Sequence, residues 1–119
     1  MAKILLIDDQ QAIRALLRTV LERAGHEVCE ATNGREGLAS YRTSPADLVI
    51  TDIAMPEMNG LELILELTRG FLSVKVIAIT GIDGEYNLQA AKLLGARQTL
   101  QKPFSMDKLL TVVRYELAH

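Results

Sequence analysis

Short apolar runs alternate along the chain with segments in which apolar residues recur every three or four positions. The apolar runs cover residues 3–7, 48–50 and 74–79, and the last two are rich in β-branched side chains. Strands that are buried on both faces have this composition, as in a parallel sheet that is covered by helices. Two further short strands are expected at 27–31 and 99–101.

Two helices are predicted from apolar stripes at helical spacing. The first stripe consists of Ile13, Leu16, Leu17, Val20 and Leu21. Gly25 follows it at a position that is typical of a helix end. The second stripe lies near the C-terminus and consists of Met106, Leu109, Leu110, Val113 and Leu117. Ser105 precedes this stripe and is suited to cap the N-terminus of the last helix.

Three further helices have weaker signals. One is expected at 35–42, after the turn sequence Thr32-Asn33-Gly34 and before the break at Ser44-Pro45. The segment 61–67 partly fits a strand, but its flanking glycines and a pair of glutamates four positions apart favour a helix. The last of the three covers 85–94 and is closed by a glycine.

The resulting order is a strand followed by a helix, repeated five times. This alternation implies an α/β protein with a parallel sheet and right-handed crossovers. Five strands fit a doubly wound, flavodoxin-like sheet with strand order 2-1-3-4-5, although the pattern alone leaves other orders open. With 119 residues and no linker segment, residues 1–119 are expected to form a single domain.

Composition narrows the class of protein. The chain is 49% hydrophobic and 24% charged, as a globular domain is, and no apolar run approaches the roughly 20 residues that cross a bilayer. The first apolar run is too short for a secretory signal, so a cytoplasmic protein is expected. The net charge is −2 and the basic residues are scattered, which argues against nucleic-acid binding by this domain. Cys29 is the single cysteine and is expected to be a packing residue.

Polar side chains follow most of the predicted strands. Asp8 and Asp9 follow the first strand, Asp52 the third, Thr80 the fourth and Lys102 the fifth. Taken singly, each has a structural explanation as a helix cap, a turn residue or a solvated charge. Ligands of open parallel sheets, however, bind beyond the carboxyl ends of the strands. In the 2-1-3-4-5 order the first and third strands are neighbours, which would bring the three aspartates within a few ångströms of one another.

Three carboxylates this close would resist ionisation unless a cation lay among them. Oxygen ligands without His or Cys select a hard ion, and a small set with room for water and phosphate oxygens suits Mg²⁺ better than Ca²⁺. Thr80 and Lys102 would face the same pocket as an anion clamp, which phosphoryl transfer requires. Asp52 would lie between the metal and this clamp, so its carboxylate is the expected nucleophile.

Five motifs follow one another at characteristic spacing. They are Ile4-Leu5-Leu6-Ile7-Asp8-Asp9, the stretch from Asp52 to Gly60, the stretch from Val76 to Gly81, Leu94-Gly95-Ala96 and Lys102-Pro103-Phe104. Together they resemble the receiver domains of two-component response regulators, chemotaxis regulators among them. The resemblance runs over essentially all 119 residues.

The resemblance implies a phosphoryl-accepting signalling switch rather than an enzyme. Asp52 would accept the phosphoryl group from the phosphohistidine of a sensor histidine kinase or a phosphotransfer protein. The surface of the fourth helix, fifth strand and fifth helix would then change and control a downstream protein or an output domain. The cognate kinase and the output are not specified by the sequence.

The resemblance also implies the ligands. Asp9 would bind Mg²⁺ directly and Asp8 through water, while Asp52 and the backbone carbonyl of Ala54 would complete the metal site. Thr80 and Lys102 would bind the phosphoryl group. The peptide bond between Lys102 and Pro103 is expected to be cis. The residues that would shape the loop over the site are Met55, Pro56 and Gly60.

The chain departs from the family pattern at several positions. Thr99 stands where the family usually has Tyr or Phe, and it cannot fill the space of an inward-turning ring. Gln10 stands where an acidic residue is common. Ala54 and Ile82 occupy positions that tune dephosphorylation, and because both are apolar we predict a comparatively long-lived phosphoryl group. The change at Thr99 leaves homodimer formation through the fourth and fifth helices open.

Three other functions are weaker. A phosphohydrolase with an aspartate nucleophile would need Asp-x-Asp after the first strand, whereas this chain has Asp8-Asp9-Gln10. A docking module that has lost phosphorylation would be expected to lack one of the acidic residues, Thr80 or Lys102. A nucleotide-binding fold would need a Gly-x-Gly-x-x-Gly or Walker A sequence, and neither occurs.

Overall fold

A computed structural model of the chain describes residues 2–55, 58–81 and 85–119. The predictions for Pro56 and Ile82 lie outside the described residues. Within the described part, no helix is long and apolar enough to cross a bilayer.

The described residues form five strands and five helices, which alternate as the sequence predicts. The strands are β1 (Lys3–Ile7), β2 (Glu27–Ala31), β3 (Leu48–Asp52), β4 (Val76–Thr80) and β5 (Gln98–Gln101). The helices are α1 (Gln11–Arg23), α2 (Gly34–Thr43), α3 (Gly60–Gly70), α4 (Glu85–Leu94) and α5 (Met106–Ala118). The segment predicted as 61–67 is helical, because Asn59 caps it by accepting a hydrogen bond from Glu62 N, and β4 begins two residues later than predicted.

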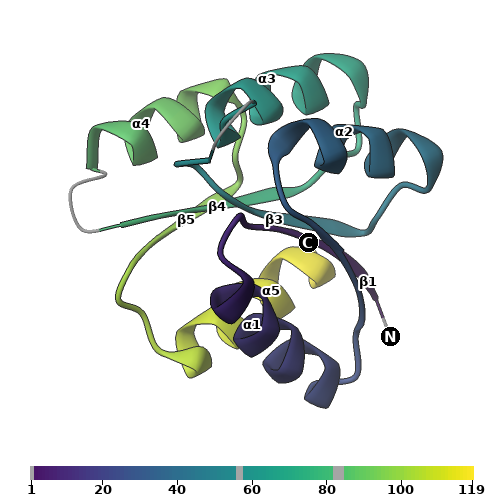
Figure 1. The fold of residues 1–119 in the computed structure, drawn as a ribbon, viewed down its shortest axis with the longest axis vertical. Coiled ribbons are helices and arrows are strands. Elements are labelled where there is room, and N and C mark those ends of the chain that lie inside the picture. The colour runs from purple at the N-terminus through teal and green to yellow at the C-terminus, as the bar shows by residue number, and fades with distance from the viewer. Residues whose placement is uncertain (1, 56–57, 82–84) are drawn as a thin grey trace.

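The strands form one sheet in the order β2-β1-β3-β4-β5, and every neighbouring pair is parallel. The predicted flavodoxin-like topology is therefore confirmed. Helices α1 and α5 cover one face of the sheet, and α2, α3 and α4 cover the other (Figure 1). Strands β3 and β4 lie inside the sheet and are buried along their whole length, which explains why their sequences are continuous apolar runs.

The core consists of two apolar clusters, one on each face of the sheet. The cluster under α2, α3 and α4 includes Leu63, Ile64 and Leu67 of α3. The opposite cluster includes Leu17 and Leu21 of α1 together with residues of α5. Leu16 belongs to the apolar stripe of α1, but 52% of its surface is exposed, because the stripe is wider than the face that contacts the sheet.

The helix ends follow local rules that position the loops. Asn33 and Ser105 cap α2 and α5 by accepting hydrogen bonds from Glu36 N and Lys108 N. Helix α1 ends in a Schellman motif, in which Gly25 N donates to Glu22 O and His26 N donates to Leu21 O. Gly25 has a φ of 95°, a conformation that other residues rarely adopt.

Replacing Gly25 by alanine tests this helix end. A Cβ at Gly25 would meet no atom within 4 Å, so the cost comes from the backbone conformation alone. We expect Gly25→Ala to lower the free energy of unfolding by about 1–2 kcal/mol in urea titrations. Gly70→Ala is the matched control, since that position is equally open and has no positive φ. Equal effects of the two substitutions would contradict the prediction.

Candidate functional site

The three predicted aspartates meet at the carboxyl ends of β1 and β3. The two strands are neighbours in the sheet, with Ile7 opposite Thr51, so Asp8 and Asp52 leave the sheet side by side. One carboxylate oxygen from each of Asp8, Asp9 and Asp52 lies within 4.8 Å of the others. Asp8 and Asp52 are buried, whereas Asp9 is exposed and opens the cluster to solvent.

The loop after β1 holds Asp8 through its backbone and its side chain. Asp8 N donates to Ala31 O at the end of β2, over 3.2 Å. The carboxylate accepts a hydrogen bond from Gln10 N, with 2.8 Å between Asp8 Oδ1 and that nitrogen. Arg14 of α1 donates from Nη1 to the carbonyl oxygen of Asp8 at 2.7 Å. These contacts fix where the buried carboxylate points.

The loop after β3 is held close to Asp52 by Gly60. Ile53 N donates to Ile79 O of β4, and Gly60 N donates to Ile53 O at 2.8 Å. A Cβ on Gly60 would lie 2.6 Å from the Cα of Ile53 and closer still to the carbonyl oxygen of Asp52. Only glycine allows the start of α3 to approach the acidic cluster this closely.

Lys102 reaches the acidic cluster from the end of β5. Its backbone N donates to Thr80 O at 2.7 Å, which ties the end of β5 to the end of β4. Its Nζ lies 3.5 Å from Asp52 Oδ2 and 3.9 Å from Asp8 Oδ2. Thr80 itself is buried beside Asp52, one position beyond the pairing of Asp52 with Ile79. The peptide bond between Lys102 and Pro103 is cis, as predicted.

Burial dominates the electrostatics of the cluster. It raises the pKa of Asp8, and the nearby Asp52 charge adds to that rise while the hydrogen bond from Gln10 N and the charge of Lys102 oppose it. Burial also raises the pKa of Asp52, against the lowering effect of Lys102 and of the Ile53 amide. A single ammonium group therefore does not compensate for the buried carboxylates.

The donor set of the cluster fits a hard divalent cation. All of its side-chain donors are carboxylate oxygens, and the exposed Asp9 leaves coordination positions for water or phosphate oxygens. A cavity of about 480 Å³ opens beside the cluster, lined by Asp9, Ile53, Ala54, Met55, Asn59, Leu61 and Asn87. The arrangement can therefore hold a cation and an anionic group together, with access from solvent.

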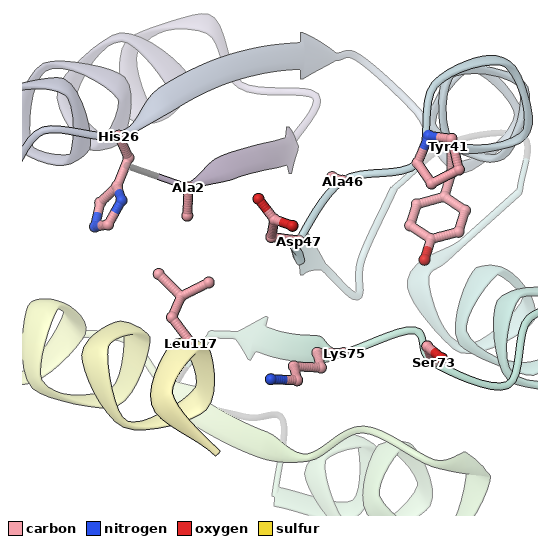
Figure 2. Close-up of a pocket in the computed structure, with 9 residues that line it drawn as sticks. Ala2, His26, Tyr41, Ala46, Asp47, Ser73, Lys75 and Leu117 are labelled. Carbon is pink, nitrogen blue, oxygen red and sulfur yellow. The ribbon is translucent and has the colours of Figure 1, made fainter.

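A larger cavity, of about 720 Å³, lies at the other end of the strands, where β1, β3 and β4 begin. Asp47 and Lys75 lie on opposite sides of it (Figure 2). Both charges already have partners, because Asp47 Oδ2 accepts from Lys3 N and Lys75 Nζ donates to Glu116 O. None of the predicted site residues lines this cavity, whereas Asp9 and Ala54 line the smaller cleft, which is therefore the candidate site.

Several residues outside the acidic cluster make packing contacts. Cys29 is partly buried against the core, as expected of a packing residue. Thr99 is half-buried on β5, opposite Ala78 of β4. Tyr115 is 51% exposed and stacks on His119 at a ring distance of 4.0 Å.

Sequence reasoning missed Arg14 and Glu30. Arg14 Nε donates to Glu30 Oε1 at 3.0 Å while its Nη1 contacts the Asp8 carbonyl, and its side chain is only 13% exposed. The available signal was the place of Arg14 directly after Ile13 of the apolar stripe, at the edge of the buried face. The pairing with Glu30 depends on how α1 crosses β2, which no local pattern encodes.

Comparison with known proteins agrees with this geometry. Residues 4–114 match the family of response regulator receiver domains, and the chain belongs to that family. It is 34% identical to the chemotaxis protein CheY of Thermotoga maritima, over 91% of both chains. It is 37% identical to protein PilH of Pseudomonas aeruginosa, over 99% of both. The crystal structure of a response regulator receiver domain protein from Clostridium thermocellum superposes with a TM-score of 0.93 at 32% identity, covering 99% of this chain and 95% of that one.

The pKa of Asp52 makes its contribution to stability depend on pH. Because burial raises this pKa above the ordinary 3.8, the folded state keeps the proton to a higher pH than the unfolded state does. Without metal, stability should therefore fall as pH rises from the unfolded pKa through the folded pKa, and stay lower above it.

Asp52→Asn removes this penalty. In EDTA at neutral pH we expect a higher free energy of unfolding for Asp52→Asn than for the parent, with the gain vanishing in acid, as measured by urea unfolding across pH. Glu66→Gln, at an exposed carboxylate in the middle of α3, should change stability by no more than about 0.5 kcal/mol. A variant less stable than the parent at neutral pH would refute the argument.

Proposed function

We propose that this receiver domain, taken as residues 1–119, is a Mg²⁺-dependent phosphoryl-accepting switch of a two-component phosphorelay, with Asp52 as the acceptor. The observation that carries the proposal is the position of the Asp52 carboxylate. It lies among the carboxylates of Asp8 and Asp9, within 4.8 Å, and 3.5 Å from the ammonium group of Lys102. A carboxylate between a cation site and a fixed positive charge is suited to attack a phosphoryl group.

In the proposed reaction, an Asp52 carboxylate oxygen attacks the phosphorus of a phosphohistidine on a sensor kinase or phosphotransfer protein. The phosphorus–nitrogen bond breaks, the imidazole leaves and takes up a proton, and an acyl phosphate forms on Asp52. The cleft beside Asp9 and Ala54 gives the donor access to this face. The chain itself acts on no other substrate, so its role is regulatory rather than enzymatic.

The proposed roles of the other site residues follow from where they lie. Asp8, Asp9, Asp52 and the carbonyl of Ala54 would hold Mg²⁺, which when bound would neutralise the carboxylates and the phosphoryl oxygens. Lys102 would shift its contact from the Asp52 carboxylate to a phosphoryl oxygen. The Thr80 hydroxyl would donate a hydrogen bond to another. Each of these contacts would stabilise the negative charge that develops on the transferred phosphoryl group.

We propose that the signal leaves the site through the end of β5. The hydrogen bond from Lys102 N to Thr80 O joins the two residues that would contact the phosphoryl group. Movement of either residue would therefore displace β5 and, through it, the adjoining faces of α4 and α5. Leu93 of α4 is 89% exposed and Tyr115 of α5 is 51% exposed, so each of these helices offers apolar surface to a downstream protein. Thr99, being small, would not transmit the change by filling a pocket.

The relatives suggest what the output could be. The chain spans 52% of the KDP operon transcriptional regulatory protein KdpE of Escherichia coli, at 38% identity. It spans 91% of the chemotaxis protein CheY of Thermotoga maritima. We propose a cytoplasmic protein that controls a separate partner or an attached output domain, without contacting nucleic acid or membrane through the receiver domain itself.

Intact mass spectrometry after incubation with acetyl phosphate and Mg²⁺ tests the acceptor. We expect one phosphoryl adduct on the parent and none on Asp52→Ala. Asp47→Ala, at an exposed aspartate at the other end of the strands, should keep the adduct. An adduct that persists in Asp52→Ala would exclude Asp52 as the acceptor, and a parent that takes up no phosphoryl group would favour a phosphorylation-independent docking module.

The lifetime of the phosphoryl group is a separate prediction. The exposed Ala54 lines the cleft and has no polar group to orient an attacking water, so we expect the isolated phosphoprotein to persist well beyond seconds. Ala54→Asn introduces an amide at the same place and should shorten the lifetime. Decay of the adduct after removal of acetyl phosphate measures both. A parent lifetime of seconds, or no change in Ala54→Asn, would contradict the prediction.

A further inference from the structure

Arg14 connects three separate elements next to the acidic cluster. Its Nη1 donates to the carbonyl oxygen of Asp8 at 2.7 Å, and its Nε donates to Glu30 Oε1 at 3.0 Å. Arg14 belongs to α1, Glu30 to β2 and Asp8 to the loop after β1. The guanidinium therefore links a helix and a neighbouring strand to the loop that carries two of the aspartates.

The contact with the Asp8 carbonyl constrains both aspartates. The peptide unit between Asp8 and Asp9 is planar, so the direction of the Asp8 carbonyl also sets the position of the Asp9 Cα. The side of Asp8 that faces β2 is fixed by its own amide, which donates to Ala31 O. Arg14 fixes the following peptide. Together they leave the Asp8-Asp9 pair little freedom to turn its carboxylates away from Asp52.

Glu30 holds the guanidinium in this orientation. Its second oxygen accepts from Arg18 Nη1 at 2.5 Å, so both carboxylate oxygens are engaged by arginines of α1. Hydrogen bonds from Arg18 and Arg14 lower the pKa of Glu30, which keeps it ionised. The planar guanidinium of Arg14 presents donors in a fixed fork, so pairing Nε with Glu30 aims Nη1 at the Asp8 carbonyl.

The charge of Arg14 by itself would work against a cation at the site. Among the residues that the structure describes, Arg14 forms an ion pair with Glu30 and with none of the three aspartates. A positive group near a cation site weakens cation binding through repulsion. If Arg14 acted only through its charge, its removal would strengthen Mg²⁺ binding. If it acts by orienting the Asp8-Asp9 peptide, its removal would weaken binding.

We propose that Arg14 is a positioning residue of the metal site, which Glu30 locks in place and which orients the Asp8-Asp9 pair through the Asp8 carbonyl. This inference rests on the proposed function, because it assumes that Mg²⁺ binds at the acidic cluster. Groups that orient metal ligands from outside the coordination shell commonly change metal affinity by about 10–100-fold.

The test compares Mg²⁺ affinity by calorimetric titration, and the phosphorylation rate with acetyl phosphate at saturating Mg²⁺, in matched variants. Arg14→Gln is expected to weaken Mg²⁺ binding about tenfold. Arg14→Lys keeps the positive charge but loses the planar guanidinium that contacts Glu30 and the Asp8 carbonyl together. It should weaken Mg²⁺ binding to a similar extent. Arg23→Gln is the control, because Arg23 is an exposed arginine in the last turn of the same helix, outside the contacts that join Arg14, Glu30 and Asp8. It should leave Mg²⁺ affinity unchanged.

The outcomes separate the inference from the proposed function. Tighter binding in Arg14→Gln together with parent-like binding in Arg14→Lys would show a purely electrostatic effect and overturn the positioning role. Equal losses of Mg²⁺ affinity in the Arg14 and Arg23 variants would indicate a general effect on the helix and would overturn the positioning role. If Arg14→Gln fails to fold, Mg²⁺ binding is measured in Arg14→Lys and Glu30→Gln instead. Mg²⁺ affinities equal to the parent's in both variants would overturn the inference. A parent that binds no Mg²⁺ would instead refute the proposed function, and the inference with it.

Discussion

The structure depends on the burial of carboxylates at the ends of two neighbouring parallel strands. The order β2-β1-β3-β4-β5 places Asp8 next to Asp52, and burial raises the pKa of both. Removing these groups from water has a free-energy cost that the rest of the fold must offset. A fold with a large apolar cluster on each face of the sheet can tolerate this cost at the carboxyl ends of two strands. Such local conflict with stability is characteristic of a functional site.

Several features of the loops follow from this constraint. Lys102 supplies an opposite charge, Gln10 N donates to the Asp8 carboxylate, and Arg14 holds the Asp8 carbonyl. Gly60 lets the start of α3 lie against the backbone of Asp52 and Ile53. The carboxyl ends of the strands thus hold the backbone around the carboxylates through several hydrogen bonds, while the exposed Asp9 leaves the cluster open to solvent.

Strand β5 connects the candidate site with the buried Glu116 of α5. Just after the C-terminal end of β5, the backbone N of Lys102 donates a hydrogen bond to the carbonyl oxygen of Thr80. At the N-terminal end, Gln98 Nε2 donates to Oε2 of the buried Glu116 of α5 at 2.8 Å. Arg97 also pairs with Glu116, at 2.5 Å. The far end of α5 is therefore fixed to the start of β5. Contacts at both ends of β5 are therefore made without an aromatic ring at Thr99.

The sequence by itself determined the order of elements and indicated most residues of the candidate site. Apolar runs such as β4 must be buried on both faces, and Asp8, Asp52, Thr80 and Lys102 stand directly after such runs. Tertiary structure alone decided the exposure of Leu16, the contact of Gly60 with the Asp52 backbone and the bridge from Glu30 through Arg14 to Asp8. Periodicity reports which face of an element is apolar, because burial acts on each element separately. It does not report where two elements cross, because that depends on how all the side chains between them pack.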